Sequence, residues 1–132
     1  MSDTTKKPIR VLVVDDNQDA ATSLGELLAS AGYEVEVSFD GATALETAEK
    51  FHPDACVLDI NMPGMDGYEL ARRLRDKSPN DPPVLATMTA KEDYAHLDQA
   101  AEAGFDLHFT KPANPWEVAD QIDDCIDQKA SV

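Results

Sequence analysis

The chain has 132 residues, a length typical of one compact domain. Acidic residues outnumber basic ones 26 to 11, and the resulting formal net charge of −15 disfavours binding to nucleic acids and to anionic membranes. No apolar stretch is long enough to cross a bilayer, and residues 1–8 lack the apolar core of a signal peptide, so we expect a cytoplasmic protein. The two cysteines are too few for a disulfide framework, and Cys56, inside an apolar run, is expected to be a core residue.

Short apolar runs alternate along the chain with segments of helical periodicity. The predicted strands are 9–14, 34–37, 55–58, 84–88 and 107–109. The runs 9–14, 55–58 and 84–88 are almost continuously apolar, which is typical of strands that are buried on both faces. The run 34–37 alternates between glutamate and valine, which predicts a strand at the edge of the sheet.

Helix signals lie between these strands. Leu24, Leu27, Leu28 and Ala31 have the spacing of one helix face, and Gly32 follows as a stop. Further along, Asp66 resembles the start of a capping box, and Leu70 and Leu74 are expected on the buried face of the helix that follows.

The last helix has the clearest start signal. Asn114 is a typical N-cap residue, and Pro115 occupies the first helical position. Its apolar stripe is predicted to consist of Val118, Ile122, Cys125 and Ile126. Gly104 is expected to end the preceding helix. Five strands alternating with five helices predict an α/β fold, a doubly wound parallel sheet with helices on both faces. Ligands bind such sheets at the carboxyl ends of the strands.

Chemically active side chains stand where the predicted strands end. Asp15 and Asp16 follow the first strand, Asp59 follows the third, Thr89 the fourth and Lys111 the fifth. Each alone is explained by a cap, a turn or a solvated surface. Together, three carboxylates at one crevice repel one another unless a cation binds there. The absence of nearby histidines or cysteines in the sequence favours Mg²⁺ over zinc.

A phosphoryl acceptor fits these groups. A carboxylate is ionised at neutral pH and needs no general base to attack phosphorus. A metal ion and an ammonium group reduce its repulsion from the incoming phosphoryl group, and a hydroxyl such as that of Thr89 donates to a phosphoryl oxygen.

At these residues the chain resembles the receiver domain of two-component response regulators. The matching motifs are Val13-Val14-Asp15-Asp16-Asn17, Leu58-Asp59-Ile60-Asn61-Met62-Pro63-Gly64-Met65-Asp66-Gly67, Met88-Thr89-Ala90 and Lys111-Pro112. The resemblance implies a flavodoxin-like sheet with strand order 2-1-3-4-5. We expect the receiver domain to cover 9–127, with a flexible segment at 1–8 and a short tail at 128–132.

The resemblance also implies the roles of the metal-site residues. Asp59 matches the phosphate-accepting aspartate, Asp16 the direct Mg²⁺ ligand and Asp15 its water-mediated helper, while the main-chain carbonyl of Asn61 completes the protein ligands. These residues define the expected metal and phosphoacceptor site.

The expected switch lies on the other side of the phosphoryl group. Thr89 is similar to the hydroxyl that moves onto this group, and Lys111 to the lysine that pairs with it. His108 stands where many receivers have an inward-swinging Tyr or Phe. The resemblance thus implies a single-domain, chemotaxis-regulator-like signalling switch rather than a turnover enzyme. It takes a phosphoryl group from a histidine kinase or a histidine phosphotransfer protein and acts on a downstream protein target.

The alternative is a haloacid-dehalogenase-type phosphatase with Asp59 as nucleophile. Such enzymes need a second aspartate two residues later as general acid and base, and Asn61 stands at that position. A flavodoxin-like cofactor binder would need a phosphate-cradling loop after the first strand, where Asp15 and Asp16 would repel the phosphate. A purely structural module would not need convergent carboxylates.

Overall fold

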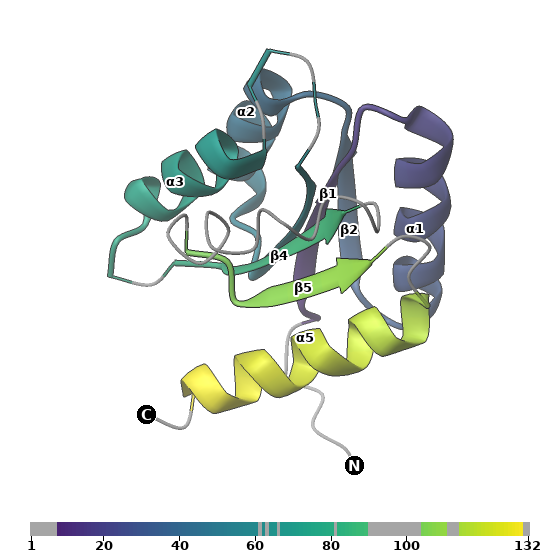
Figure 1. Cartoon of the computed structure of the whole chain (residues 1–132). Helices are drawn as coiled ribbons and strands as arrows, with labels where there is room; N and C mark the ends of the chain where they lie inside the picture. Colours follow the sequence, from purple (N-terminus) through teal and green to yellow (C-terminus); the bar gives the residue numbers. More distant parts are fainter. Residues whose placement is uncertain are drawn as a thin grey trace.

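The computed structural model describes residues 8–60, 62, 64–65, 67–80, 82–89, 104–110 and 114–130, without the side chains of 89, 129 and 130. Its strands are β1 (Arg10–Val14), β2 (Glu34–Ser38), β3 (Ala55–Asp59), β4 (Val84–Thr89) and β5 (Leu107–Thr110). They form one parallel sheet in the order β2-β1-β3-β4-β5 (Figure 1). The predicted doubly wound sheet and its strand order are therefore confirmed.

Four helices cover the two faces of the sheet in the described part of the chain. They are α1 (Gln18–Ser30), α2 (Gly41–Phe51), α3 (Gly67–Lys77) and α5 (Pro115–Ala130). Helices α1 and α5 pack on one face, and α2 and α3 pack on the other (Figure 1). The fifth predicted helix, between β4 and β5, lies outside the described residues. None of the described helices combines the length and apolar character that a bilayer span requires.

The continuous apolar runs are explained by burial on both faces of the sheet. In β1, Val11 and Val13 belong to the core cluster beneath α1 and α5, whereas Leu12 and Val14 belong to the cluster beneath α2 and α3. Cys56 lies in the second of these clusters and is fully buried, as predicted. The alternating pattern of β2 also has the predicted meaning, because this strand is at the sheet edge and exposes its glutamates.

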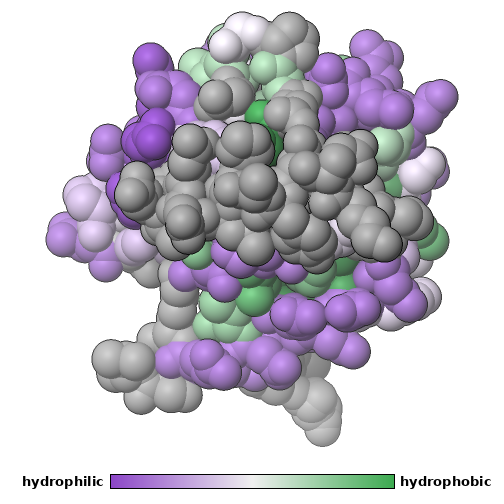
Figure 2. Space-filling model, in the orientation of Figure 1, coloured by the Kyte–Doolittle hydropathy of each residue, from purple (hydrophilic) through white to green (hydrophobic). Residues whose placement is uncertain are grey.

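The last helix begins and packs as its sequence predicts. Asn114 Oδ1 accepts a hydrogen bond from the main-chain N–H of Trp116 at 2.9 Å, and the helix begins at Pro115. Val118 and Ile122 are fully buried, with Cys125 and Ile126 partly buried beside them. Helix α5 is the lowest helix in Figure 1. In the same orientation, Figure 2 shows hydrophilic residues (purple) along the lower part of the molecule and hydrophobic residues (green) just above them.

The predicted apolar face of α1 is partly wrong. Leu27 is 43% exposed and Ala31 is exposed, although Leu24 and Leu28 are buried. The buried face consists of Ala21, Leu24, Gly25 and Leu28. Small residues decide this rotation, because a β-carbon at Gly25 would lie 2.8 Å from Val37 Cγ2 of β2. The helix thus packs so close to the sheet that only glycine fits there.

The glycines predicted to end helices have the backbone conformation of such stops. Gly32 follows α1 with φ +107° and Gly104 precedes β5 with φ +92°, a region that L-residues with side chains rarely adopt. The helix expected before Gly104 and the capping residue Asp66 lie outside the described residues. Leu70 and Leu74 are buried on α3, as predicted.

Candidate functional site

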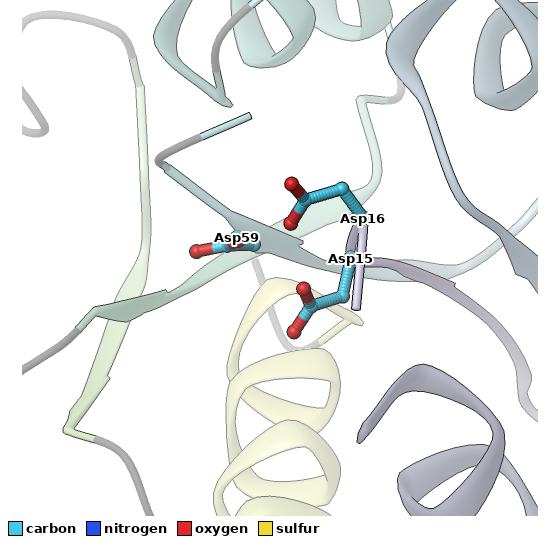
Figure 3. A group of neighbouring side chains, drawn as sticks. All are labelled: Asp15, Asp16 and Asp59. Carbon is cyan, nitrogen blue, oxygen red and sulfur yellow. The ribbon is translucent and has the colours of Figure 1, made fainter. Parts of the chain in front are cut away.

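Three carboxylates meet at the carboxyl ends of two neighbouring strands. Asp59 is the last residue of β3, and Asp15 and Asp16 directly follow β1. Because β1 and β3 pair in register up to Val14 and Leu58, the residues that follow emerge side by side. Each of the three aspartates offers a carboxylate oxygen within 4.8 Å of those offered by the other two (Figure 3). The structure therefore brings together three of the residues that the sequence assigned to this site.

The aspartates differ in burial and support. Asp15 and Asp59 are each only 7% exposed, whereas Asp16 is exposed. Asp15 Oδ1 accepts a hydrogen bond from the main-chain N–H of Asn17 at 3.0 Å, and the Asp15 N–H donates to the Ser38 carbonyl of β2 at 3.2 Å. Asn17 in turn caps α1 by accepting from the N–H of Ala20 at 3.1 Å. The turn that carries Asp15 is thus fixed by both a strand and a helix.

The main chain at Asp59 is held by the start of α3. The N–H of Gly67 donates to the Ile60 carbonyl at 3.0 Å, and the N–H of Met62 donates to the same oxygen at 3.2 Å. The acceptor Ile60 and the donor Met62 flank Asn61 in the sequence. The main-chain carbonyl of Asn61 is the predicted metal ligand. Asn61 itself lies outside the described residues. Ile60, on its amino-terminal side, is buried.

The electrostatics of this cluster favour a hard cation. Carboxylates this close repel one another when they carry charge, and two of the three are shielded from water. A bound divalent ion removes this repulsion. The group contains only oxygen donors, which suit Mg²⁺ or Ca²⁺ and not a site for zinc with histidine or cysteine ligands. The donor set therefore fits the predicted Mg²⁺ ion.

A cavity of about 630 Å³ extends from the carboxylates between α1 and the start of α5. Asp15 and Asp59 line it together with Leu24, Leu27 and Pro115. Leu27, which the sequence pattern assigned to the apolar face of α1, is thus part of the cavity wall. Two of the three aspartates thus line a cavity whose wall includes residues of α1.

The remaining predicted site residues are only partly described. Thr89 ends β4 and pairs in register with Thr110 of β5, but its side chain is outside the described part, as is all of Lys111. His108 lies in β5 with an exposed side chain, and its ring centroid is 6.4 Å from that of Phe105. Gly67 has a packing role that the sequence pattern did not predict, although a glycine at the start of a helix after the Asp59 loop is a signal for close backbone approach.

The comparisons with known proteins agree on one family. Residues 11–123 match the model of the response regulator receiver domain. The chain is 43% identical over 110 residues to the transcriptional regulatory protein PrrA of Mycobacterium leprae (strain TN). The aligned region covers 83% of this chain and 46% of PrrA. Its identity to the response regulator MprA of Mycobacterium sp. (strain KMS) is 40% over 105 residues, 80% of this chain and 45% of MprA. The chain therefore spans a little less than half the length of these curated relatives.

A solved structure shows the same fold. The crystal structure of a CheY-like response regulator receiver domain protein from Methanospirillum hungatei JF-1 has a TM-score of 0.86 to this chain at 26% identity. The match covers 95% of this chain and 98% of that one. The residues matched by the family model and the strand order of the sheet both agree with the resemblance to receiver domains at the strand-end motifs. The chain belongs to the response regulator receiver domains of two-component signalling systems.

Proposed function

We propose that Asp59 accepts a phosphoryl group from a histidine kinase or a histidine phosphotransfer protein. The observation that carries this proposal is the set of three carboxylates with oxygens within 4.8 Å of one another, two of them buried. Asp15, Asp16, Asp59 and the main-chain carbonyl of Asn61 would hold Mg²⁺. The bound ion supplies positive charge that offsets the repulsion between carboxylate and phosphoryl oxygens.

The chemistry needs little beyond positioning. A carboxylate oxygen of Asp59 attacks phosphorus, a P–O bond forms, the P–N bond of the donor phosphohistidine breaks, and the imidazole leaves with the electron pair. The Gly67 N–H donates to the carbonyl of Ile60, the residue that directly follows Asp59, and this bond limits movement of the chain that carries the nucleophile. Hydrolysis of the resulting acyl phosphate by water returns the carboxylate, so uptake and loss are both self-catalysed.

Thr89 and Lys111 are proposed to bind the phosphoryl oxygens. Met88 pairs in register with Asp59, so Thr89 extends one residue past the phosphoacceptor on the adjacent strand. Lys111 follows Thr110, the last residue of β5, at the same end of the sheet. A hydroxyl and an ammonium group from these positions would approach the phosphoryl group from the β4 and β5 side. His108 would then change its position as part of the switch.

The output of this domain is proposed to be a phosphorylation-dependent contact with a downstream protein. Acidic residues exceed basic ones by 15, which disfavours nucleic acids and anionic membranes as direct partners of this chain. The receiver unit is proposed to span 9–127.

The decisive experiment is to locate the adduct. The chain is incubated with acetyl phosphate, with Mg²⁺ or with EDTA, and the phosphorylated peptide is identified by mass spectrometry. Modification at Asp59 that requires Mg²⁺ and is lost in Asp59→Asn supports the proposal. Asp54→Asn is the matched control, because Asp54 directly precedes β3, at the opposite end of that strand, and this variant should be labelled normally. Labelling at another residue would overturn the proposal, and steady turnover of phosphomonoesters would favour the phosphatase.

A further inference from the structure

The hydroxyl group of Thr87 is buried without a hydrogen-bond partner among the described residues. Thr87 lies in the middle of β4 and is 0% exposed, and its Oγ1 has no hydrogen-bond partner in the described part of the molecule. Its in-register neighbour on β3 is Leu58, an apolar residue of the core cluster beneath α2 and α3. Native proteins rarely leave such a group unpaired, since burial removes its bonds to water. The unpaired hydroxyl of Thr87 is therefore an unusual feature of this core.

The neighbour on the other side of Thr87 is His108. Thr87 and His108 are in register on the parallel strands β4 and β5, and their side chains lie on the same face of the sheet. The adjacent pair Met88 and Phe109 belongs to the opposite core cluster, as the alternation of strand residues requires. His108 is exposed, so the imidazole stands at the surface while its cross-strand neighbour is buried.

Ring contacts connect His108 to the phosphoacceptor end of the sheet. The ring centroids of His108 and Phe105 are 6.4 Å apart, and Phe105 meets Tyr68 edge to face at 6.3 Å. Tyr68 directly follows Gly67, which contacts the main chain of Asp59 and Ile60. These contacts supply physical continuity between the nucleophile and β5.

We propose that Thr87 is a positioning residue that receives the imidazole of His108 in the phosphorylated state. This inference rests on the proposed function of Asp59. The ring turns from the surface toward β4, and a ring nitrogen and Thr87 Oγ1 then share a hydrogen bond. Strands in a sheet are about 4.8 Å apart, which places the hydroxyl within reach of the imidazole. One contact thus satisfies the orphan hydroxyl and the nitrogen that the movement would bury.

The side chains of Thr87 and His108 have complementary hydrogen-bonding groups. An imidazole always carries at least one N–H that can donate to Oγ1, and the neutral ring also offers an acceptor to the hydroxyl. A phenylalanine in place of His108 would need no polar partner on β4. Thr87 and His108 are therefore expected to act as a unit, and the effect of changing one depends on the other.

The test follows the position of His108 by NMR with isotopically labelled histidine. Beryllofluoride with Mg²⁺ serves as the phosphoryl analogue on Asp59. Wild type, Thr87→Val and Thr87→Ser are compared, with the exposed His52 at the end of α2 as the internal reference. The ratio of inward to outward His108 should fall roughly fivefold in Thr87→Val, the effect of one net hydrogen bond, and recover in Thr87→Ser.

A structural role alone would give a different pattern. Valine removes an unpaired hydroxyl without changing the side-chain shape, so Thr87→Val should fold and its melting temperature should not fall. The affinity for beryllofluoride should also drop up to fivefold in Thr87→Val but be unaffected by the same change in a His108→Phe background.

The possible failures are distinguishable. If beryllofluoride binds at Asp59 and His108 responds equally in wild type and Thr87→Val, the role of Thr87 is overturned while the proposed function stands. If wild-type Asp59 takes up neither beryllofluoride nor a phosphoryl group, both are overturned.

Discussion

The first residue of α3, Gly67, lies against the main-chain carbonyl of Asp59. A β-carbon at Gly67 would stand 2.6 Å from Asp59 O and 2.8 Å from Ile60 Cα, closer than side-chain carbons approach backbone atoms. Because both neighbours are backbone, they yield only if the end of β3 moves. Gly67 thus allows the start of α3 and Asp59, the proposed phosphoacceptor, to occupy adjacent positions.

We predict that Gly67→Ala impairs both stability and phosphoryl uptake. Overpacking against backbone is expected to lower the free energy of unfolding by about 1–3 kcal/mol. Displacement of Asp59 should slow labelling by acetyl phosphate by about tenfold or more, since small misplacements of reacting groups are costly. Urea denaturation and the initial labelling rate measure the two effects.

Gly25→Ala is the matched control for this prediction. Its β-carbon would meet Val37 Cγ2 at 2.8 Å, so the crowding involves a side chain away from the carboxylates. This variant should change stability and leave the labelling rate near that of wild type. Equal labelling rates in Gly67→Ala and wild type would contradict the proposed role of the glycine.

Removal of one carboxylate should show how much charge repulsion and metal binding each change the stability of the protein. Asp16 is the exposed member of the trio, and among the residues that the structure describes no helix cap or main-chain hydrogen bond depends on its side chain. In EDTA, Asp16→Asn is expected to raise the free energy of unfolding by about 1 kcal/mol, the scale of a close charge pair in water. With Mg²⁺ the wild type gains stability in proportion to the logarithm of metal concentration, and the variant should gain much less.

The melting temperature in EDTA and in millimolar MgCl₂ measures both effects. Asp19→Asn is the control, because it makes the same charge change in the first turn of α1. It should keep the wild-type response to Mg²⁺. A wild type whose melting temperature ignores Mg²⁺ would contradict the metal assignment.

The cap of α2 predicts a pH dependence of stability. Asp40 accepts a hydrogen bond from the Thr43 N–H at 2.7 Å and another from Thr43 Oγ1 at 3.1 Å, which holds the pKa of this carboxyl below its ordinary value. A lowered folded-state pKa means that the stabilisation is complete above the unfolded pKa, about 3.9, and is lost as the pH falls through the folded pKa. The window is therefore below about pH 4.

Two variants test this cap. Asp40→Ala should cost about 1 kcal/mol at pH 7, whereas Asp40→Asn retains a capping oxygen and should cost less. Between pH 5 and pH 2, the wild type should lose stability relative to Asp40→Asn. Glu46→Gln, on the exposed face of the same helix, removes one charge without a cap and should parallel the wild type. Identical acid profiles for wild type and Asp40→Asn would exclude a contribution from Asp40 ionisation.

The two cysteines should differ in reactivity. Cys56 is fully buried, and burial raises the pKa of its thiol because the thiolate loses hydration. Cys125 is only partly buried on α5. Since alkylation requires the thiolate, iodoacetamide at pH 8 should modify Cys125 at least about tenfold faster than Cys56 in the native protein. Peptide mass spectrometry gives both rates, and in guanidinium chloride they should converge; comparable native rates would be inconsistent with the buried position.

The sequence alone determined the sheet and the acidic site because their signals are local. In β1, every position from Val11 to Val14 is apolar, a pattern typical of a strand covered on both faces. Aspartates that directly follow parallel strands emerge at the same edge whatever the details of packing, so the meeting of Asp15, Asp16 and Asp59 followed from strand ends alone. The start of α5 was equally local, since Asn114 caps the helix by a bond two residues away.

Tertiary packing decided what local pattern does not encode. Leucine spacing predicts an apolar face of α1 through Leu27. In the structure the helix instead buries Gly25 close to Val37, and the exposed Leu27 lines the cavity beside the carboxylates. The contact of Gly67 with Asp59 and the register of Thr87 with His108 join residues eight and twenty-one positions apart. Such contacts depend on where separate elements meet in space, and the local sequence of one element does not indicate which residue of another element it will contact.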